Sequence, residues 1–262
     1  MKVTLVQTDI KWSDPSANYH EAEQLMEQAE RSDLYVLPEM WTTGFIMEPE
    51  GTAEESDNAI GTVETFRWMR LMAKKYDAAI AGSVAVKIPD GTFRNRFYFV
   101  TPDDECFYDK RHLFRYGGED KYYTGGEERT IVTWRGVRFL LQICYDLRFP
   151  VFSRNRKDYD VAIYVANWPD SRRRVWDTLL KARALENQCY VMGVNRVGDD
   201  PHCHYDGGTV VIDAYGRTTV QADDDVQQTV TASLDMEKLH AFRQKFPVLA
   251  DGDDFCLADF TD

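Results

Sequence analysis

Three short and almost entirely apolar runs limit the fold of this chain more than any other feature of its sequence. The runs are Val137–Ile143, Val161–Ala166 and Tyr190–Asn195. A strand that is apolar on both faces has to be covered on both faces, which is typical of parallel strands in α/β proteins. A helix is predicted between the second and third runs, over Arg173–Asn187, with an apolar stripe that faces inward. The sequence therefore predicts an α/β fold in which helices cover the sheet faces.

Strands and helices alternate through the rest of the chain as well. Asp14 and Pro15 predict the start of a helix, because aspartate caps helices well and proline is favoured at the first helical position. Further helices are predicted over Val63–Tyr76 and Asp235–Phe246. The other predicted strands are Val3–Gln7, Asp33–Pro38, Ala78–Val86, Arg94–Thr101, Glu105–Asp109, Thr209–Asp213, Thr218–Gln221 and Gln228–Leu234.

The chain is predicted to form a single domain over residues 1–262. No segment rich in proline, glycine or serine divides it, and no internal repeat is visible. The acidic tail over residues 247–262 still holds Phe255, Leu257 and Phe260. Because a merely solvated tail has no need of such side chains, we expect the tail to pack on the domain or on a partner subunit.

Charge and cysteine content exclude several classes of function. The chain has 31 basic and 44 acidic residues and a net charge of −13, so it lacks the basic footprint that nucleic acids and anionic membranes require. No run approaches the ~18 apolar residues of a membrane span, and the apolar start of the N-terminus is too short for a signal peptide. The five cysteines include no CxxC pair, which argues against a zinc cluster or a disulfide framework. The expected location is a reducing cytoplasm.

Three ionisable residues lie where predicted strands end. Glu39 lies in LPEMW, Lys110 in DKRHLF and Cys144 in QICYDLRFP. Functional groups collect at the carboxyl ends of strands in α/β sheets, so all three are candidates for a site. Each also has a plain structural interpretation when it is taken singly: a solvated turn glutamate, half of a surface ion pair, and a small buried hydrophobe. Composition and periodicity do not decide between these interpretations.

The order and the local context of these residues resemble those of the nitrilase superfamily of carbon–nitrogen hydrolases, whose members carry a Glu–Lys–Cys triad. The resemblance covers nearly the full length, and it rests on LPEMWTTGF, DKRHLF, QICYDLRFP, ANWP and KARALENQCYVMGVNRVG. The stretch NWPDSRRRVWDTLLKARALENQ is most similar to the bacterial omega-amidase branch. The resemblance implies an αββα sandwich, extended to αββααββα in a homodimer whose C-terminal tails contact the partner subunit. It also implies that no metal or organic cofactor is needed.

The resemblance assigns roles to five residues. Cys144 would be the nucleophile and form a thioester, and Glu39 would be its general base. Lys110 and the backbone N–H of Tyr145 would bind the oxyanion. A second glutamate, hydrogen-bonded to the lysine, would steer the substrate, and Glu119 is the best match for it.

Omega-amidases hydrolyse monoamides of four- and five-carbon dicarboxylic acids, such as 2-oxoglutaramate and 2-oxosuccinamate, so the pocket needs a group that binds a carboxylate. Arg148 follows the nucleophile by four residues, and Arg172, Arg173 and Arg174 begin a predicted helix. Our hypothesis is that Arg148 or one of this cluster binds the carboxylate. Consecutive residues of a helix point in different directions, so at most two of the three can reach one pocket.

Other residues near these motifs have a structural and a functional interpretation. The aromatic side chains Trp41, Phe45, Tyr116 and Trp168 are candidates for the pocket wall, although aromatic residues at strand ends more often belong to the core. The sequence Pro201-His202-Cys203-His204 looks like a metal site, but no other ligand is spaced to complete it, and no metal is predicted. The paired glycines at 117–118 and 125–126 match no phosphate-binding loop and are interpreted as loop residues.

Two alternative functions stay open at this point. One is another branch of the superfamily, such as an N-carbamoyl amino acid hydrolase or an aliphatic nitrilase. The other is a catalytically silent homologue that binds a metabolite. Ammonia release from a panel of amides, ureides and nitriles would separate them.

Overall fold

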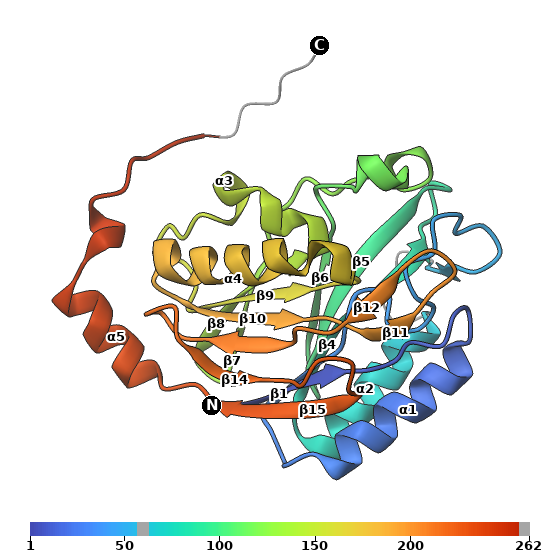
Figure 1. Cartoon of the computed structure of the whole chain (residues 1–262), viewed down its shortest axis with the longest axis horizontal. Coiled ribbons are helices and arrows are strands. Elements are labelled where there is room, and N and C mark those ends of the chain that lie inside the picture. The colour runs from blue at the N-terminus through green and yellow to red at the C-terminus, as the bar shows by residue number, and fades with distance from the viewer. Residues whose placement is uncertain (57–62, 257–262) are drawn as a thin grey trace.

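The fold consists of two large β-sheets that pack face to face, each with helices on its outer face (Figure 1). The structure is a computed structural model, and it describes residues 1–56 and 63–256. One apolar cluster fills the space between the sheets, a second lies between the first sheet and its helices, and a third lies between the second sheet and its helix. The predicted αββα arrangement is confirmed.

The first sheet has the strand order β15–β1–β2–β4–β5–β6, with β3 paired to β4. Its strands are β1 (Lys2–Gln7), β2 (Leu34–Val36), β3 (Glu54–Glu55), β4 (Ala79–Lys87), β5 (Phe93–Val100), β6 (Glu105–Asp109) and β15 (Gln228–Ser233). The neighbours β1, β2 and β4 are parallel. Helices α1 (Pro15–Gln28) and α2 (Glu64–Tyr76) cover its outer face. Asp14 caps α1 as predicted, by accepting a hydrogen bond from the N–H of Ala17.

The second sheet has the order β14–β13–β10–β9–β8–β7. Its strands are β7 (Ile131–Trp134), β8 (Val137–Ile143), β9 (Val161–Val165), β10 (Tyr190–Val194), β13 (Val210–Ile212) and β14 (Thr218–Gln221). The three apolar runs of the sequence form β8, β9 and β10, which are parallel and almost fully buried. Helix α4 (Arg173–Asn187) covers the outer face, with Trp176 and Leu180 buried against the sheet.

The sequence of α4 predicts an inward apolar stripe that includes Leu185 and an outward face for the basic residues, and the structure contradicts this prediction at two positions, Leu185 and Arg183. Leu185 was expected to face the core, yet 52% of it is exposed. Arg183 was expected to face outward with the other basic residues, yet it is buried. Its guanidinium donates a hydrogen bond to the carbonyl of Leu147 and pairs with Glu186, and these contacts offset the cost of burying the charge.

Short elements complete the chain. They are the hairpin β11 (Val197–Asp199) and β12 (His204–Asp206), the helices α3 (Pro150–Ser153) and α5 (Met236–Lys245), and the 3-10 turns η2 (Arg115–Gly117), η3 (Glu119–Lys121), η4 (Cys144–Arg148), η5 (Asp170–Arg172) and η6 (Val248–Ala250). Helix α5 confirms the helix predicted over Asp235–Phe246. The others were not predicted, because segments of three to five residues carry no clear periodicity. Across residues 1–56 and 63–256, no helix is long and apolar enough to cross a membrane.

The chain ends in a C-terminal arm, residues 236–256, that leaves the body of the protein (Figure 1). Leu239 is the buried residue of α5, while 58% of Phe246 is exposed. The arm is held to the second sheet by Arg243, which pairs with Asp160. Of the apolar tail residues that the sequence singled out, Phe255 is partly buried, whereas Leu257 and Phe260 lie outside the described residues.

Candidate active site

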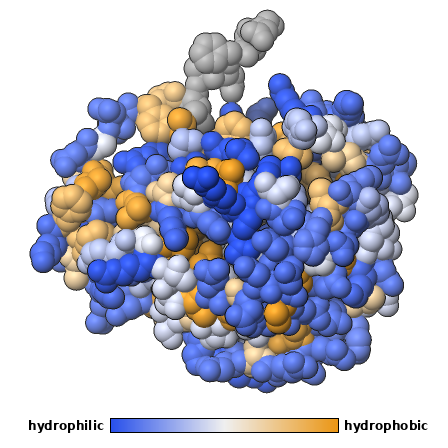
Figure 2. Space-filling view, in the orientation of Figure 1, coloured by the Kyte–Doolittle hydropathy of each residue, from blue (hydrophilic) through white to orange (hydrophobic). Residues whose placement is uncertain are grey.

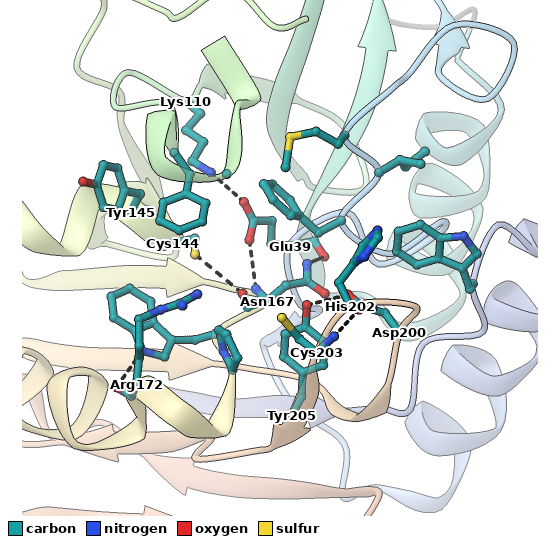
Figure 3. Close-up of a pocket in the computed structure, with 18 of the residues that line it drawn as sticks. Glu39, Lys110, Cys144, Tyr145, Asn167, Arg172, Asp200, His202, Cys203 and Tyr205 are labelled. Carbon is teal, nitrogen blue, oxygen red and sulfur yellow. Dashed lines mark hydrogen bonds and ion pairs between the residues drawn. The ribbon is translucent and has the colours of Figure 1, made fainter. Parts of the chain in front are cut away.

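A cavity of about 490 Å³ opens where strands of both sheets end, and Glu39, Lys110 and Cys144 all line it (Figure 3). Glu39 follows β2 and Lys110 follows β6, so both come from the first sheet. Cys144 follows β8 of the second sheet. The structure thus brings together the three residues that the sequence singled out, and the cavity volume is within the usual range for small-molecule sites.

Lys110 lies between two carboxylates, and all three side chains are buried. Its Nζ is 2.9 Å from Oε1 of Glu39 and 3.0 Å from Oε2 of Glu119. The amide of Asn95 donates to Oε1 of Glu39 at 2.8 Å and reaches Oε1 of Glu119 at 3.4 Å. The N–H of Phe114 donates to Oε2 of Glu119 at 2.6 Å. The ammonium group of Lys110 is therefore shared between the two glutamates.

Burial and these charges shift the protonation equilibria of the cluster. Burial by itself would lower the pKa of Lys110, but Glu119 and Glu39 outweigh burial and raise this pKa, so the amine is an ammonium group. Burial raises the pKa of Glu119, and Lys110 opposes that rise. Burial and the negative charge of Glu39 raise the pKa of the Cys144 thiol well above its ordinary value, against the opposing effect of Lys110. The resting cysteine is therefore a neutral thiol at pH 7, and it needs a base to become a nucleophile.

Glu39 is held in place by Asn167, which lies just after β9 in the second sheet. The N–H of Asn167 donates to Oε2 of Glu39 at 2.8 Å, and its side-chain amide donates to the carbonyl of Glu39 at 2.6 Å. The Sγ of Cys144 lies 4.0 Å from the carbonyl oxygen of Asn167. Neither Asn95 nor Asn167 has a role predicted from the sequence. The only signal for Asn167 was the ANWP motif, which was part of the resemblance.

Cys144 occupies a sharp turn between β8 and η4. Its φ of +44° lies in the left-handed region, which residues other than glycine rarely adopt. The turn directs the side chain into the cavity, away from the strand. Tyr145 lies in the first turn of η4, where backbone N–H groups have no partner within the helix and can donate to a ligand.

Arg148 and Arg172 both line the cavity. The guanidinium of Arg148 lies 5.3 Å from the ring centre of Trp168, and that of Arg172 lies 5.3 Å from the ring centre of Phe114. Among the residues that the structure describes, neither arginine has a carboxylate within ion-pair distance. Two uncompensated cations therefore face the same cavity as Cys144.

Arg173 does not line the cavity, which corrects the prediction that it binds substrate. Its guanidinium lies about 3 Å from three carboxylates, those of Asp177, Asp206 and Asp224. Arg174 is exposed and does not line the cavity either. Because side chains at the start of α4 point in different directions, Arg172 alone of the three consecutive arginines reaches the cavity.

Two of the four aromatic candidates line the cavity. These are Phe45, whose ring centre lies 5.2 Å from the Nζ of Lys110, and Trp168. Tyr116 is 89% exposed and outside the cavity wall, because η2 turns its side chain toward solvent. Trp41 is fully buried in the layer between the first sheet and its helices, where it packs against Tyr19. The predictions for Tyr116 and Trp41 as pocket walls are therefore wrong.

The hairpin β11–β12 forms another wall of the cavity, through Asp200, His202, Cys203 and Tyr205. The carboxylate of Asp200 holds the hairpin turn by accepting hydrogen bonds from the N–H groups of His202 and Cys203 and from the hydroxyl of Tyr205. His204 is directed elsewhere and pairs with aspartates outside the cavity. Within the described part of the chain, no three His, Cys, Asp or Glu side chains are grouped so that they could hold a metal ion.

Comparison with known proteins adds independent findings. Residues 2–244 match the carbon-nitrogen hydrolase family. The chain is 48% identical to omega-amidase YafV of Yersinia enterocolitica, over 98% of each chain. It is 33% identical to 2-oxoglutaramate amidase of Bacillus subtilis, over 95% of this chain and 96% of that one. Among solved structures, XC1258 of Xanthomonas campestris, a CN-hydrolase superfamily protein with an arsenic adduct in its active site, superposes with a TM-score of 0.92 at 42% identity, over 98% of this chain and 99% of that one.

Proposed function

The chain belongs to the carbon-nitrogen hydrolase family, as its motifs indicated, and we propose that it hydrolyses the terminal amide of short dicarboxylic acid monoamides to release ammonia. The observation that carries this proposal is the pair of uncompensated arginines, Arg148 and Arg172, in the cavity that holds Cys144. The names of the relatives, omega-amidase and 2-oxoglutaramate amidase, support the same substrate class. The expected substrates are 2-oxoglutaramate and 2-oxosuccinamate.

The first half of the reaction forms a thioester on Cys144. Glu39 takes the thiol proton while Sγ attacks the amide carbon, and the carbonyl oxygen becomes an oxyanion. The ammonium group of Lys110 and the N–H of Tyr145 bind that oxyanion. Glu39 then gives its proton to the nitrogen, the C–N bond breaks, and ammonia leaves.

The second half of the reaction releases the acid. Glu39 takes a proton from a water molecule, which attacks the thioester carbon at the face that ammonia has left. The C–S bond breaks, the thiolate of Cys144 recovers the proton, and the dicarboxylic acid is released. Lys110 binds the oxyanion again, and Glu119 keeps Lys110 in place through its contact of 3.0 Å. These steps use side chains of this chain and water.

Arg148 and Arg172 bind the far carboxylate of the substrate. Arginine pairs with carboxylates through two parallel hydrogen bonds, and such charge-assisted bonds are strong in a partly enclosed site. The rings of Trp168 and Phe114 lie beneath the two guanidinium groups and limit their motion. Trp168 and Phe45 supply the apolar wall for the carbon chain between the amide and the carboxylate.

Ammonia release tests the proposal directly. We expect hydrolysis of 2-oxoglutaramate and 2-oxosuccinamate to exceed that of an N-carbamoyl amino acid and of an aliphatic nitrile by at least about 100-fold in kcat/KM, which corresponds to about 2.7 kcal/mol of differential transition-state binding. Cys144→Ala should reduce every one of these activities to background while it remains folded. A preference for the ureide or the nitrile would replace this proposal with another branch of the family.

We also propose that the protein is a homodimer that works in the cytoplasm. Apolar side chains gather along the C-terminal arm at the left of the space-filling view (Figure 2). On the helix layer of the second sheet, Val151 and Leu185 are each 52% exposed. Exposed apolar surface of this kind is typical of subunit interfaces. All five cysteines are free thiols, as a cysteine nucleophile in a reducing compartment requires.

A further inference from the structure

The groups that carry out the proposed reaction come from two different sheets. Lys110 follows β6 of the first sheet, and Cys144 follows β8 of the second. The two sheets meet through apolar side chains, and apolar contact has no preferred direction. Directional contacts that cross from one sheet to the other are therefore needed to fix the distance between the Lys110 ammonium group and the Cys144 thiol.

Asp146, a fully buried residue of η4, makes such contacts. Its Oδ2 accepts hydrogen bonds from the hydroxyl of Tyr108 at 2.8 Å and from the N–H of Ile143 at 2.9 Å. Its Oδ1 accepts from the backbone N–H of His112 at 3.0 Å and lies 2.8 Å from Nδ1 of the same residue. Ile143 belongs to the second sheet, whereas Tyr108 and His112 stand on either side of Lys110.

The partners of Asp146 are themselves fixed. The hydroxyl of Tyr108 also accepts a hydrogen bond from the N–H of Arg111 at 3.0 Å. The ring of His112 stacks on Phe149, with 3.9 Å between ring centres and 6° between ring planes. Three hydrogen bonds and the contact with Nδ1 of His112 satisfy both oxygens of this buried carboxylate, so Asp146 joins the two segments at a fixed distance.

We propose that Asp146, Tyr108 and His112, here called the Asp146 clamp, set the position of Lys110 relative to the Cys144 thiol. Asp146 is then a positioning residue, and the inference rests on the proposed function because only a reaction at Cys144 needs Lys110 at a fixed distance. Glu39 does not depend on the clamp, since Asn167 of the second sheet already holds it. Loosening the clamp therefore moves Lys110 away and leaves Glu39 beside the thiol.

Kinetics of conservative variants test the clamp. Tyr108→Phe and His112→Ala each remove one side-chain donor to Asp146. The matched control is Tyr159→Phe, which removes a buried hydroxyl that donates to the carbonyl of Ser153 at 2.7 Å, outside the clamp. We expect kcat on 2-oxoglutaramate to fall about 10–100-fold in the two clamp variants, with KM within about twofold and with a loss in Tm similar to that of the control. His112→Asn keeps a donor near the place of Nδ1 and should recover most of kcat relative to His112→Ala.

Alkylation of Cys144 gives a readout that does not depend on the substrate. Burial, Glu39 and Glu119 raise the pKa of the Cys144 thiol, and Lys110 lowers it. Withdrawing Lys110 therefore raises that pKa, so the pH midpoint for the reaction of Cys144 with iodoacetamide should move upward in Tyr108→Phe and His112→Ala. Midpoints that coincide with that of Tyr159→Phe would overturn the clamp. If the wild-type protein does not hydrolyse 2-oxoglutaramate, the proposed function is wrong. The pH midpoints for alkylation of Cys144 in the variants would still show whether the Asp146 clamp positions Lys110.

Discussion

Lys110 is a buried cation with a carboxylate on either side, and the Cys144 thiol shares its cavity. Every charge in this group changes the protonation of the others, because little water is present to screen them. The same residues therefore determine both where the substrate oxygen binds and how readily the thiol loses its proton. Variants of single residues should separate these two effects.

Glu39→Gln tests the effect of the base on the thiol. Glu39 raises the pKa of Cys144, second only to burial, so removing its charge should lower that pKa. The pH midpoint for alkylation of Cys144 should then move downward, while kcat falls by a factor of about 10²–10⁴ because the general base is lost. Mass spectrometry of the Cys144 peptide measures the first quantity and ammonia release the second.

The control for this variant is Glu48→Gln, at an exposed glutamate of the cavity rim. It should leave both the midpoint and kcat close to those of the wild type. An unchanged or higher midpoint in Glu39→Gln would show that the carboxylate does not act on the thiol.

Substitution of the arginines tests carboxylate binding. Arg148→Gln and Arg172→Gln should each lower kcat/KM on 2-oxoglutaramate about 10–100-fold, since a hydrogen bond to a charged group contributes ~1.5–3 kcal/mol. Hydrolysis of a neutral amide of the same length should change by less than about threefold. Arg174→Gln is the control, because Arg174 is exposed and outside the cavity. Equal losses on the charged and the neutral substrate would contradict the assignment.

At the scale of elements, the site depends on how closely segments approach one another. Gly126 donates its N–H to the carbonyl of Lys110 at 2.9 Å, and a Cβ at this position would lie 2.3 Å from the carbonyl oxygen of Asp109. Gly193 of β10 makes a similarly close approach to α4, because a Cβ at this position would lie 2.5 Å from Cδ1 of Leu180. Gly126 therefore allows its segment to pack closely against the backbone of Asp109 and Lys110, which a residue with a Cβ could not do.

Comparison of Gly126→Ala with Gly193→Ala separates catalysis from stability. Both variants overpack a tight contact, which costs typically 1–3 kcal/mol of unfolding free energy. Gly126→Ala should in addition lower kcat about tenfold or more, because it displaces the backbone that carries Lys110. Gly193→Ala should keep kcat within about twofold at temperatures where it is folded. Denaturant titration and ammonia release measure the two effects, and similar kcat values in both variants would count against the role of the loop.

For the whole molecule, the exposed apolar residues of one helix layer predict how subunits pair. Light scattering should give about twice the chain mass of 30.3 kDa. Leu185→Glu places a charge on the helix layer of the second sheet and should shift the protein toward monomer. The matched control is Leu71→Glu on α2, where Leu71 is 61% exposed on the opposite helix layer. A mass near 30 kDa for the wild type, or dissociation by Leu71→Glu alone, would contradict this interface.

The α/β class, the order of most helices and strands, and the three residues that meet in the cavity could all be predicted from the amino-acid sequence. Runs such as Val161–Ala166 and the Asp14 cap are local signals. They depend only on residues that are close together along the chain, so they can be recognised in the sequence. The family motifs then placed Glu39, Lys110 and Cys144 in one site, although they lie far apart along the chain. Their roles stay predictions until the variants are measured.

Which side chains face the cavity, and which hold the catalytic groups, became clear from the folded chain alone. Arg172 and Arg173 are neighbours in sequence, yet Arg173 meets Asp206 and Asp224, which lie more than 30 residues away along the chain. In the same way, Asp146 acquires its partners from the other sheet. The direction of a charged side chain depends on the partners that the fold brings to it, and periodicity along the chain carries no information about partners so distant in sequence.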